Sequence, residues 1–136
     1  MEQIELTKNL MVELFNECNK EFFNNELPTI PLRLTGGRRT MGSLSLDGIT
    51  GQALSIQMSR RYFATRDEFK ETMIHEMIHL YQSLVYHKVD HGMSFRRVCD
   101  AISRMSGGKF NINIVTRRKA YVTLDRYRTQ VLSVLF

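Results

Sequence analysis

The sequence predicts a single domain of the α+β class, with three main helices packed on a small antiparallel sheet. Apolar residues recur at helical spacing in three separate segments. Between the first two of these segments, short stretches of alternating apolar and polar residues are separated by Gly and Pro turn signals. The chain has 136 residues, 43% of them hydrophobic, which suffices for one core and is short for two, so we expect one domain over residues 1–136.

The first helix is predicted to begin near Thr7 and to end before the turn at Asn24 and Asn25. Its apolar face, which we expect to pack against the second helix, consists of Leu10, Met11, Leu14, Phe15, Cys18 and Phe22. Pro28 and Pro31 then close the helical region and open an extended one. Strands are predicted at residues 30–35, 41–46 and 53–59, separated by glycine-containing turns. In the last strand, apolar residues alternate with polar ones; the apolar set is Leu54, Ile56 and Met58.

The second helix has a clear start signal, because Thr65 and Glu68 fit a capping box. Its apolar face is formed by Phe69, Met73, Ile74, Met77, Ile78, Tyr81, Leu84 and Val85. A stripe of Glu71, His75, His79 and Gln82 lies away from that face. We therefore expect the histidines on a polar face of this helix and outside the packed core.

The third helix is predicted to start just after His91 and to end at Gly107-Gly108. Its apolar face is formed by Phe95, Val98, Cys99, Ile102 and Met105. Residues 110–114 alternate with period two and, with residues 121–124, predict a C-terminal hairpin. The loop of this hairpin holds Arg117, Arg118 and Lys119.

The second helix carries the sequence His75-Glu76-Met77-Ile78-His79. Histidines four residues apart on a helix share one face, so both imidazoles can reach one metal ion. Glu76 then sits beside the metal without binding it. A catalytic zinc needs three protein ligands, an open position for water, and a nearby carboxylate to accept the proton of that water. The motif therefore predicts one Zn²⁺ per chain, with Glu76 as the catalytic general base.

The third metal ligand is predicted to be His91. His87, Asp90 and His91 all lie where the chain returns toward the metal. His91 is preferred because Gly92 permits a close backbone approach and Phe95 can anchor the third helix in the core. His87 remains the alternative ligand.

A ligand imidazole usually donates its other nitrogen's hydrogen to a carboxylate or carbonyl group. Carboxylates placed for this role are Glu71, Asp90 and Asp100. Stabilisation of an oxyanion requires a donor, and the sequence does not choose among an arginine, Tyr62, Tyr81 and Tyr86. The strand at residues 53–59 is a candidate for binding a peptide by strand addition.

Four segments of the chain, ELFNECNKEFFNNELP, ALSIQMS, ETMIHEMIHLYQ and HGMSF, together resemble the SprT-like metalloprotease family, which includes the Spartan-type proteases of DNA-protein crosslinks. The resemblance covers roughly residues 10–105. It implies a zincin-like fold, zinc bound by His75, His79 and His91, and Glu76 as general base. The chain departs from many members because its two cysteines, Cys18 and Cys99, form no cysteine zinc ribbon.

The net charge of +5 is unevenly distributed. Residues 1–70 hold nine basic and nine acidic side chains, whereas residues 71–136 hold ten basic and five acidic ones. This asymmetry predicts an acidic partner, with single-stranded DNA contacted by Arg117, Arg118 and Lys119 as the favoured case. A solvated basic face is the alternative.

Both cysteines lie on predicted apolar helix faces, so we expect two core thiols and no disulfide framework. No apolar run is long enough for a membrane span, and Glu2 and Glu5 stand where a signal peptide carries basic residues. A cytoplasmic location is expected, or a nucleoid or nuclear one if the protein associates with DNA.

The leading functional hypothesis is a zinc endopeptidase of SprT-like type that acts on protein or peptide substrates, including DNA-bound or DNA-crosslinked proteins. Two alternatives stay open. One is a DNA-independent peptidase, and the other is a metal-stabilised binding or structural protein with little hydrolytic activity.

Overall fold

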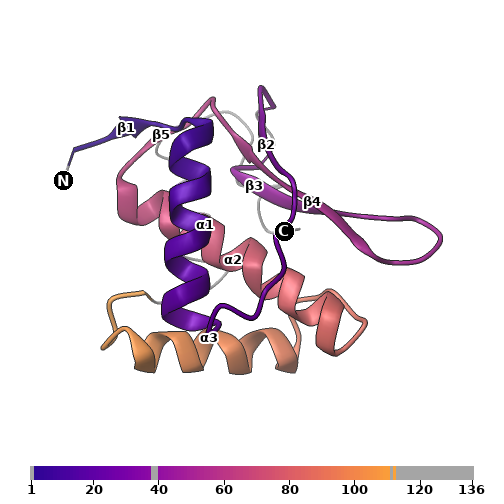
Figure 1. The fold of residues 1–136 in the computed structure, drawn as a ribbon. Coiled ribbons are helices and arrows are strands. Elements are labelled where there is room, and N and C mark those ends of the chain that lie inside the picture. Colours follow the sequence, from indigo (N-terminus) through magenta and orange to yellow (C-terminus); the bar gives the residue numbers. More distant parts are fainter. Residues whose placement is uncertain (1, 38–39, 111, 113–136) are drawn as a thin grey trace.

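The structure is a computed structural model that describes residues 2–37, 40–110 and 112. It contains the three expected helices, α1 (Lys8–Phe22), α2 (Arg66–Val85) and α3 (Met93–Met105) (Figure 1). The strands in this part of the chain are β1 (Ile4–Glu5), β2 (Leu32–Thr35), β3 (Gly42–Leu46), β4 (Ala53–Ser59) and β5 (Phe63–Ala64). The predicted α+β class is confirmed, whereas the predicted C-terminal hairpin, with Arg117, Arg118 and Lys119, lies outside the described residues.

The main sheet is mixed, and the prediction of an antiparallel sheet is wrong for one of its strands. Its order is β2-β4-β3, with β3 antiparallel and β2 parallel to β4. The reason is that β4 inserts between β2 and β3, so that it runs back along its hairpin partner β3 and alongside β2. A second, two-stranded ribbon pairs β1 with β5, and its two-residue strands are too short to show alternation in the sequence.

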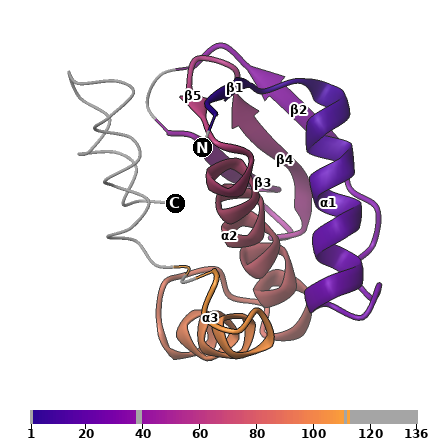
Figure 2. The ribbon, with the colours of Figure 1, turned by 90° about the vertical axis from the view of Figure 1, so that its left-hand side faces the viewer.

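Helix α2 lies in the middle of the molecule (Figure 2). Helices α1 and α2 pack on one face of the main sheet, α1 against β2 and α2 against β3 and β4. Helix α3 contacts α2 and runs crosswise beneath α1 in the view of Figure 1. As a result, twelve of the twenty residues of α2 are buried.

The predicted polar face of α2 is therefore not a solvent-facing one. Of the predicted stripe, His75, His79 and Gln82 are each at most 3% exposed and Glu71 is half-buried, and Glu76 beside the stripe is fully buried. The stripe faces β3 and the segment around α3 instead of water. Because burial of polar groups is costly unless they have partners, this stripe must be held by other polar groups or by a metal ion.

The helix starts follow the predicted caps. The Thr65 hydroxyl accepts a hydrogen bond from the Glu68 backbone N–H at 3.1 Å, and the Thr65 N–H donates to the Glu68 carboxylate at 2.9 Å. Thr7 caps α1 in the same way by accepting from the Leu10 N–H. Asn24 and Asn25 both adopt positive φ and turn the chain away from the end of α1.

A group of ion pairs joins α1 to α2. The ammonium of Lys70, almost buried, lies 2.6 Å from Glu17 and 2.9 Å from Glu21. Arg66 donates two hydrogen bonds to the Glu17 carboxylate. These bonds from Arg66, followed by those from Lys70, hold the pKa of Glu17 below its ordinary value. The Lys70 ammonium also lies 5.0 Å from the ring centre of Phe110, which brings the chain after α3 back onto α1 and α2.

The apolar pattern of the helices and strands is largely confirmed, but four residues predicted on apolar faces are exposed. Three of them lie at helix ends: Leu84 and Val85 in the last turn of α2 are 46% and 50% exposed, and Met105, the last residue of α3, is 55% exposed. The fourth is in β4. Ile56 and Met58 are fully buried, but Leu54 is 49% exposed because the first residues of β4 extend beyond the helices. Cys18 and Cys99 are buried as expected, and burial raises the pKa of each thiol to about 12. None of the helices in the described part of the chain is both long and apolar enough to cross a bilayer.

Candidate metal centre

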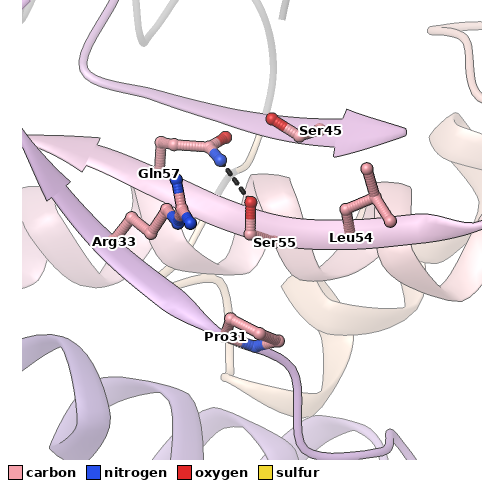
Figure 3. Close-up of a pocket in the computed structure, with 6 residues that line it drawn as sticks. All are labelled: Pro31, Arg33, Ser45, Leu54, Ser55 and Gln57. Carbon is pink, nitrogen blue, oxygen red and sulfur yellow. Dashed lines mark hydrogen bonds between the residues drawn. The ribbon is translucent and has the colours of Figure 1, made fainter. Parts of the chain in front are cut away.

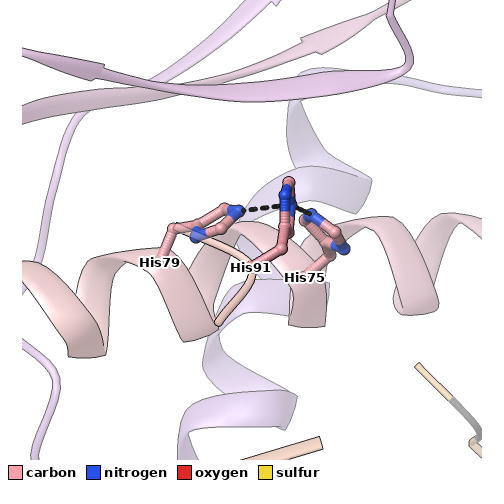
Figure 4. A group of neighbouring side chains, drawn as sticks. All are labelled: His75, His79 and His91. Atoms are coloured by element: carbon pink, nitrogen blue, oxygen red, sulfur yellow. Dashed lines mark hydrogen bonds between the residues drawn. The ribbon is translucent and has the colours of Figure 1, made fainter. Parts of the chain in front are cut away.

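Three imidazoles meet beside α2. His75 and His79 project from adjacent turns of that helix, and His91 reaches them from the segment before α3 (Figure 4). Nε2 of His91 lies 3.1 Å from Nε2 of His75 and 3.2 Å from Nε2 of His79. One potential ligand nitrogen from each ring lies within 4.8 Å of the others.

The spacing of these nitrogens suits a metal ion. A tetrahedral zinc with bonds of about 2.1 Å to nitrogen separates two of its ligands by about 3.4 Å. The two separations of 3.1 and 3.2 Å are close to that value. Three neutral imidazoles that present lone pairs to one point repel one another unless a cation lies between them. The donor set therefore fits a metal, and its all-nitrogen chemistry suits zinc among the common ions.

Phe95 forms an apolar wall against all three histidines. Its ring centre lies 4.8 Å from that of His75, 4.9 Å from that of His79 and 5.0 Å from that of His91. Phe95 is 2% exposed, so its expected role as a core anchor is confirmed. By filling this side, the ring limits how far each imidazole can rotate and keeps water from that side of the cluster.

Gln82 is a hydrogen-bond partner of His79. The sequence pattern predicted that both lie on one face of the second helix, but it did not predict this role for Gln82. Nδ1 of His79 donates to the Gln82 side-chain oxygen at 2.8 Å, so the lone pair of this imidazole lies on Nε2, the nitrogen that faces His91. The Gln82 amide nitrogen donates to the Ser94 hydroxyl at 2.8 Å and to Asp90 at 3.3 Å. The signal for this role was the spacing, because Gln82 follows His79 by three residues and so shares its face.

Asp90 shapes the backbone around His91 rather than binding a ligand histidine directly. Its Oδ1 accepts from the Gly92 N–H at 2.9 Å, and its Oδ2 lies 3.3 Å from Lys88. The Gly92 bond, followed by the contact with Lys88, lowers the pKa of the Asp90 carboxyl. Gly92 has a negative φ, and a Cβ there would meet Asp90 at 3.2 Å. The lack of a side chain at Gly92 therefore allows its backbone to lie close to the Asp90 carboxylate.

His87 is not part of the cluster. It is exposed and directly follows Tyr86, which caps the end of α2. Its φ of 54° is the left-handed conformation that ends many helices. Of the candidate third ligands, the structure brings only His91 to the pair on α2.

Glu76 lies fully buried next to His75, where α2 faces β3. Gly42, the first residue of β3, makes this approach possible. A Cβ on Gly42 would lie 3.3 Å from Oε2 of Glu76 and 2.9 Å from the methyl group of Thr72. The Glu76 carboxylate thus lies against the start of β3, on the residue of α2 that follows His75.

A model of the SprT-like family matches residues 11–118, which is most of the chain. This protein belongs to the SprT-like family. The family suggests a metalloprotease-like function, and the three histidines of this SprT-like protein can hold a metal ion. None of the curated proteins compared with it matches.

The expected peptide-binding role of residues 53–59 is wrong. In this SprT-like protein those residues form β4, the central strand, which pairs with β2 on one side and β3 on the other. Both backbone edges of β4 are therefore used over residues 56–58, where β2 and β3 both pair with it. Within the described residues, β3 pairs on one side only and lies next to Glu76, so it replaces β4 as the candidate.

The tyrosines predicted as oxyanion donors and the other carboxylates predicted as histidine partners lie in different parts of the structure. Tyr81 and Tyr86 line a groove of about 340 Å³ whose other walls come from the end of α1 and from α3. None of the three clustered histidines lines that groove. Tyr62 is buried, Glu71 is half-buried on α2, and Asp100 is exposed on α3. The donor for an oxyanion thus stays a prediction.

Proposed function

We propose that this protein is a zinc-dependent endopeptidase in which His75, His79 and His91 bind one Zn²⁺ and Glu76 is the general base. The observation that carries the proposal is the convergence of three Nε2 atoms beside a buried glutamate. Two of these ligands and the base come from one helix, so their relative positions are set by helix geometry.

The bound ion would supply a water of lowered pKa and polarise the scissile carbonyl group. Glu76 accepts the proton of that water and delivers it to the leaving amine. Phe95 keeps bulk water from one side of the imidazoles, which strengthens electrostatic interactions at the reacting atoms. Gln82 holds His79 with its proton on Nδ1, so that Nε2 keeps its lone pair for the metal.

In this proposal, an extended peptide substrate binds along the outer edge of β3. Its start lies against Glu76, and its outer edge carries no strand in the part of the chain that the structure describes. A peptide added along this edge would be held mainly by backbone hydrogen bonds, which do not depend on the substrate's side chains. The proposal therefore includes tolerance of varied protein sequences, and DNA-bound proteins are the substrate class that the charge distribution favours.

The test compares wild-type protein with Glu76→Gln. This change keeps the size of the buried side chain but removes the base, so zinc content should stay at about one ion per chain while hydrolysis of an unstructured protein falls by roughly 10²-fold or more. Metal analysis and a gel-based cleavage assay give both readings. Equal cleavage by the wild-type protein and Glu76→Gln would show that Glu76 is not the general base. Zinc content without any Glu76-dependent cleavage would favour a metal-stabilised binding protein.

A further inference from the structure

The part of the chain that builds the sheet has a one-sided charge. Residues 28–64 hold five basic residues, all arginines, against the single carboxylate of Asp47. The five are Arg33, Arg38, Arg39, Arg60 and Arg61. Asp47 follows the last residue of β3, at the opposite end of that strand from Gly42, and accepts hydrogen bonds from the Ile49 and Thr50 N–H groups at 2.8 Å each. Residues 1–70 as a whole carry equal numbers of basic and acidic side chains, but the segment that forms the sheet is strongly basic.

The acidic residues of α1 do not neutralise these arginines. Glu13, Glu17 and Glu21 face Arg66 and Lys70 of α2. Within the described part of the chain, Arg33, Arg60 and Arg61 form no ion pair with a carboxylate. Unpaired like charges on one surface repel one another, so an anionic partner would relieve this repulsion.

The parallel pairing of β2 and β4 gathers the arginines at one end of the sheet. Thr35 and Ser59 are paired at the ends of these strands, so Gly36 lies beside Arg60 and Arg61. Nε of Arg61 donates to the Gly36 carbonyl at 3.1 Å, and Nη2 of Arg60 lies 3.4 Å from the position of a Gly36 Cβ. Arg38 and Arg39 follow in the sequence but lie outside the described residues.

Two further side chains extend this charged end. Arg33 lies on β2 in register with Gln57 and lines a groove of about 260 Å³ on the sheet (Figure 3). Phe63, two residues after Arg61, is 56% exposed. Every other phenylalanine in the described part of the chain is buried or half-buried. An exposed aromatic residue so close in the chain to arginines that form no ion pair suits bases as well as phosphates.

We propose that the surface formed by Arg33, Arg60, Arg61 and Phe63, the arginine–phenylalanine surface, binds single-stranded nucleic acid. Guanidinium groups donate paired hydrogen bonds to phosphate oxygens, and an exposed ring stacks on an unpaired base. An acidic protein would use the charges but would leave the ring without a matching partner. Gly42 is paired with Met58, two residues before Arg60, and lies against Glu76, so a strand bound at this end of the sheet would lie near the proposed cleavage site. The binding does not depend on the proposed function; only its use in peptidase action rests on it.

The test measures binding of a fluorescent oligothymidylate of about 16 nucleotides to the full chain by anisotropy, at several salt concentrations. In Arg33→Gln/Arg60→Gln/Arg61→Gln, the slope of log affinity against log salt should fall by roughly 2, because each lost phosphate contact removes about 0.7. Phe63→Ala should weaken binding about fivefold or more without changing that slope. Glu5→Lys should strengthen binding, because Glu5 is paired with Phe63 across the β1–β5 ribbon.

A matched control removes the same number of charges from α3, as Arg96→Gln/Arg97→Gln/Arg104→Gln, and should leave affinity at the wild-type level. Because Arg61 also holds Gly36, Arg33→Gln/Arg60→Gln gives a version that leaves this bond intact. Equal losses in the α3 control would overturn the location of the site. Equal binding of duplex, or displacement of the oligonucleotide by polyglutamate at similar charge, would overturn the single-stranded partner.

The nucleic-acid proposal and the peptidase proposal can be tested independently of each other. Cleavage of a DNA-free peptide should be unchanged when the arginine–phenylalanine surface is altered. Glu76→Gln should keep full nucleic-acid affinity and lose cleavage. A surface variant that loses peptide cleavage while melting at the wild-type temperature would contradict the separation of the two sites.

Discussion

The side-chain oxygen of Gln82 accepts a hydrogen bond of 2.8 Å from Nδ1 of His79, and both side chains are buried. The same amide donates to Ser94 on α3 and to Asp90, which neighbours His91. One glutamine thus connects the helix that carries two proposed ligands to the segment that carries the third. Its hydrogen bonds also determine which nitrogen of His79 is available to a metal.

We predict that Gln82→Met lowers zinc affinity by roughly 10- to 100-fold, because the substitution keeps the size of the side chain but removes the partner of His79. Competition with a chelating dye measures this directly. Gln82→Glu retains an acceptor for His79 and loses the donor to Asp90, so its affinity should differ from that of Gln82→Met.

The control is Asn19→Leu. Asn19 is another buried amide, bonded to the backbone of Leu27 at 3.0 and 3.2 Å and belonging to α1. Its loss should lower the melting temperature and leave zinc affinity unchanged. If Gln82→Met binds zinc as tightly as wild type, or if both variants lose affinity equally, Gln82 has only a structural role.

A second prediction separates the two histidines near the end of α2. His91→Ala should lose most bound zinc, because only two imidazoles then remain near the ion. His87→Gly should keep its zinc and raise stability by a few tenths to about 1 kcal/mol, since glycine adopts the positive φ of this position more readily. Metal analysis and thermal melts check both, and zinc loss in His87→Gly would contradict the assignment.

The contact between Gly42 and α2 leads to a third prediction. Gly42→Ala should reduce hydrolysis while zinc is retained, because the added methyl group meets Thr72 at 2.9 Å and Glu76 at 3.3 Å. Thr72 cannot easily rotate, since its hydroxyl donates to the Glu68 carbonyl at 3.1 Å. Thr72→Ser deletes the obstructing methyl group, so Gly42→Ala/Thr72→Ser should recover part of the activity. Full activity of Gly42→Ala alone would show that β3 can move without cost.

The ion pairs between α1 and α2 should make stability depend on pH. The pKa of Glu17 is lower in the folded protein than its ordinary value of 4.5, mainly through hydrogen bonds from Arg66. Its contribution is therefore present above pH 4.5 and is lost as the pH falls through the folded-state pKa. Glu17→Gln should lower the free energy of unfolding by about 1 kcal/mol at neutral pH and by less in acid.

Glu13→Gln is the matched control for this change, because the Glu13 side chain is 63% exposed and lies 3.5 Å from Arg66. Urea unfolding at several pH values gives the comparison. A difference between Glu17→Gln and wild type that does not shrink in acid would mean that the effect of Glu17 is not electrostatic.

Local signals in the sequence were sufficient for the helices and for the histidine motif. The capping box of Thr65 and Glu68 acts within one turn, and His75 and His79 share a face because of helix geometry alone. His91 was also inferred correctly as the residue that reaches this pair, since only a short connection separates α2 from α3. Such features depend on residues close in the chain, and a single sequence contains them.

Only the tertiary structure decided how the elements pair and what they cover. Nothing in β2, β3 or β4 taken alone shows that β4 lies between the other two, and this order leaves β3 as the edge beside Glu76. The polar stripe of α2 looked solvent-facing because polar side chains usually meet water, yet here it meets β3, Phe95 and Gln82's partners. Similarly, Arg33 is distant in the sequence from Arg60 and Arg61, and the pairing of β2 with β4 brings them to the same sheet. The physical reason is common to all three cases: hydrogen bonds between strands and burial between layers join residues that no local pattern connects.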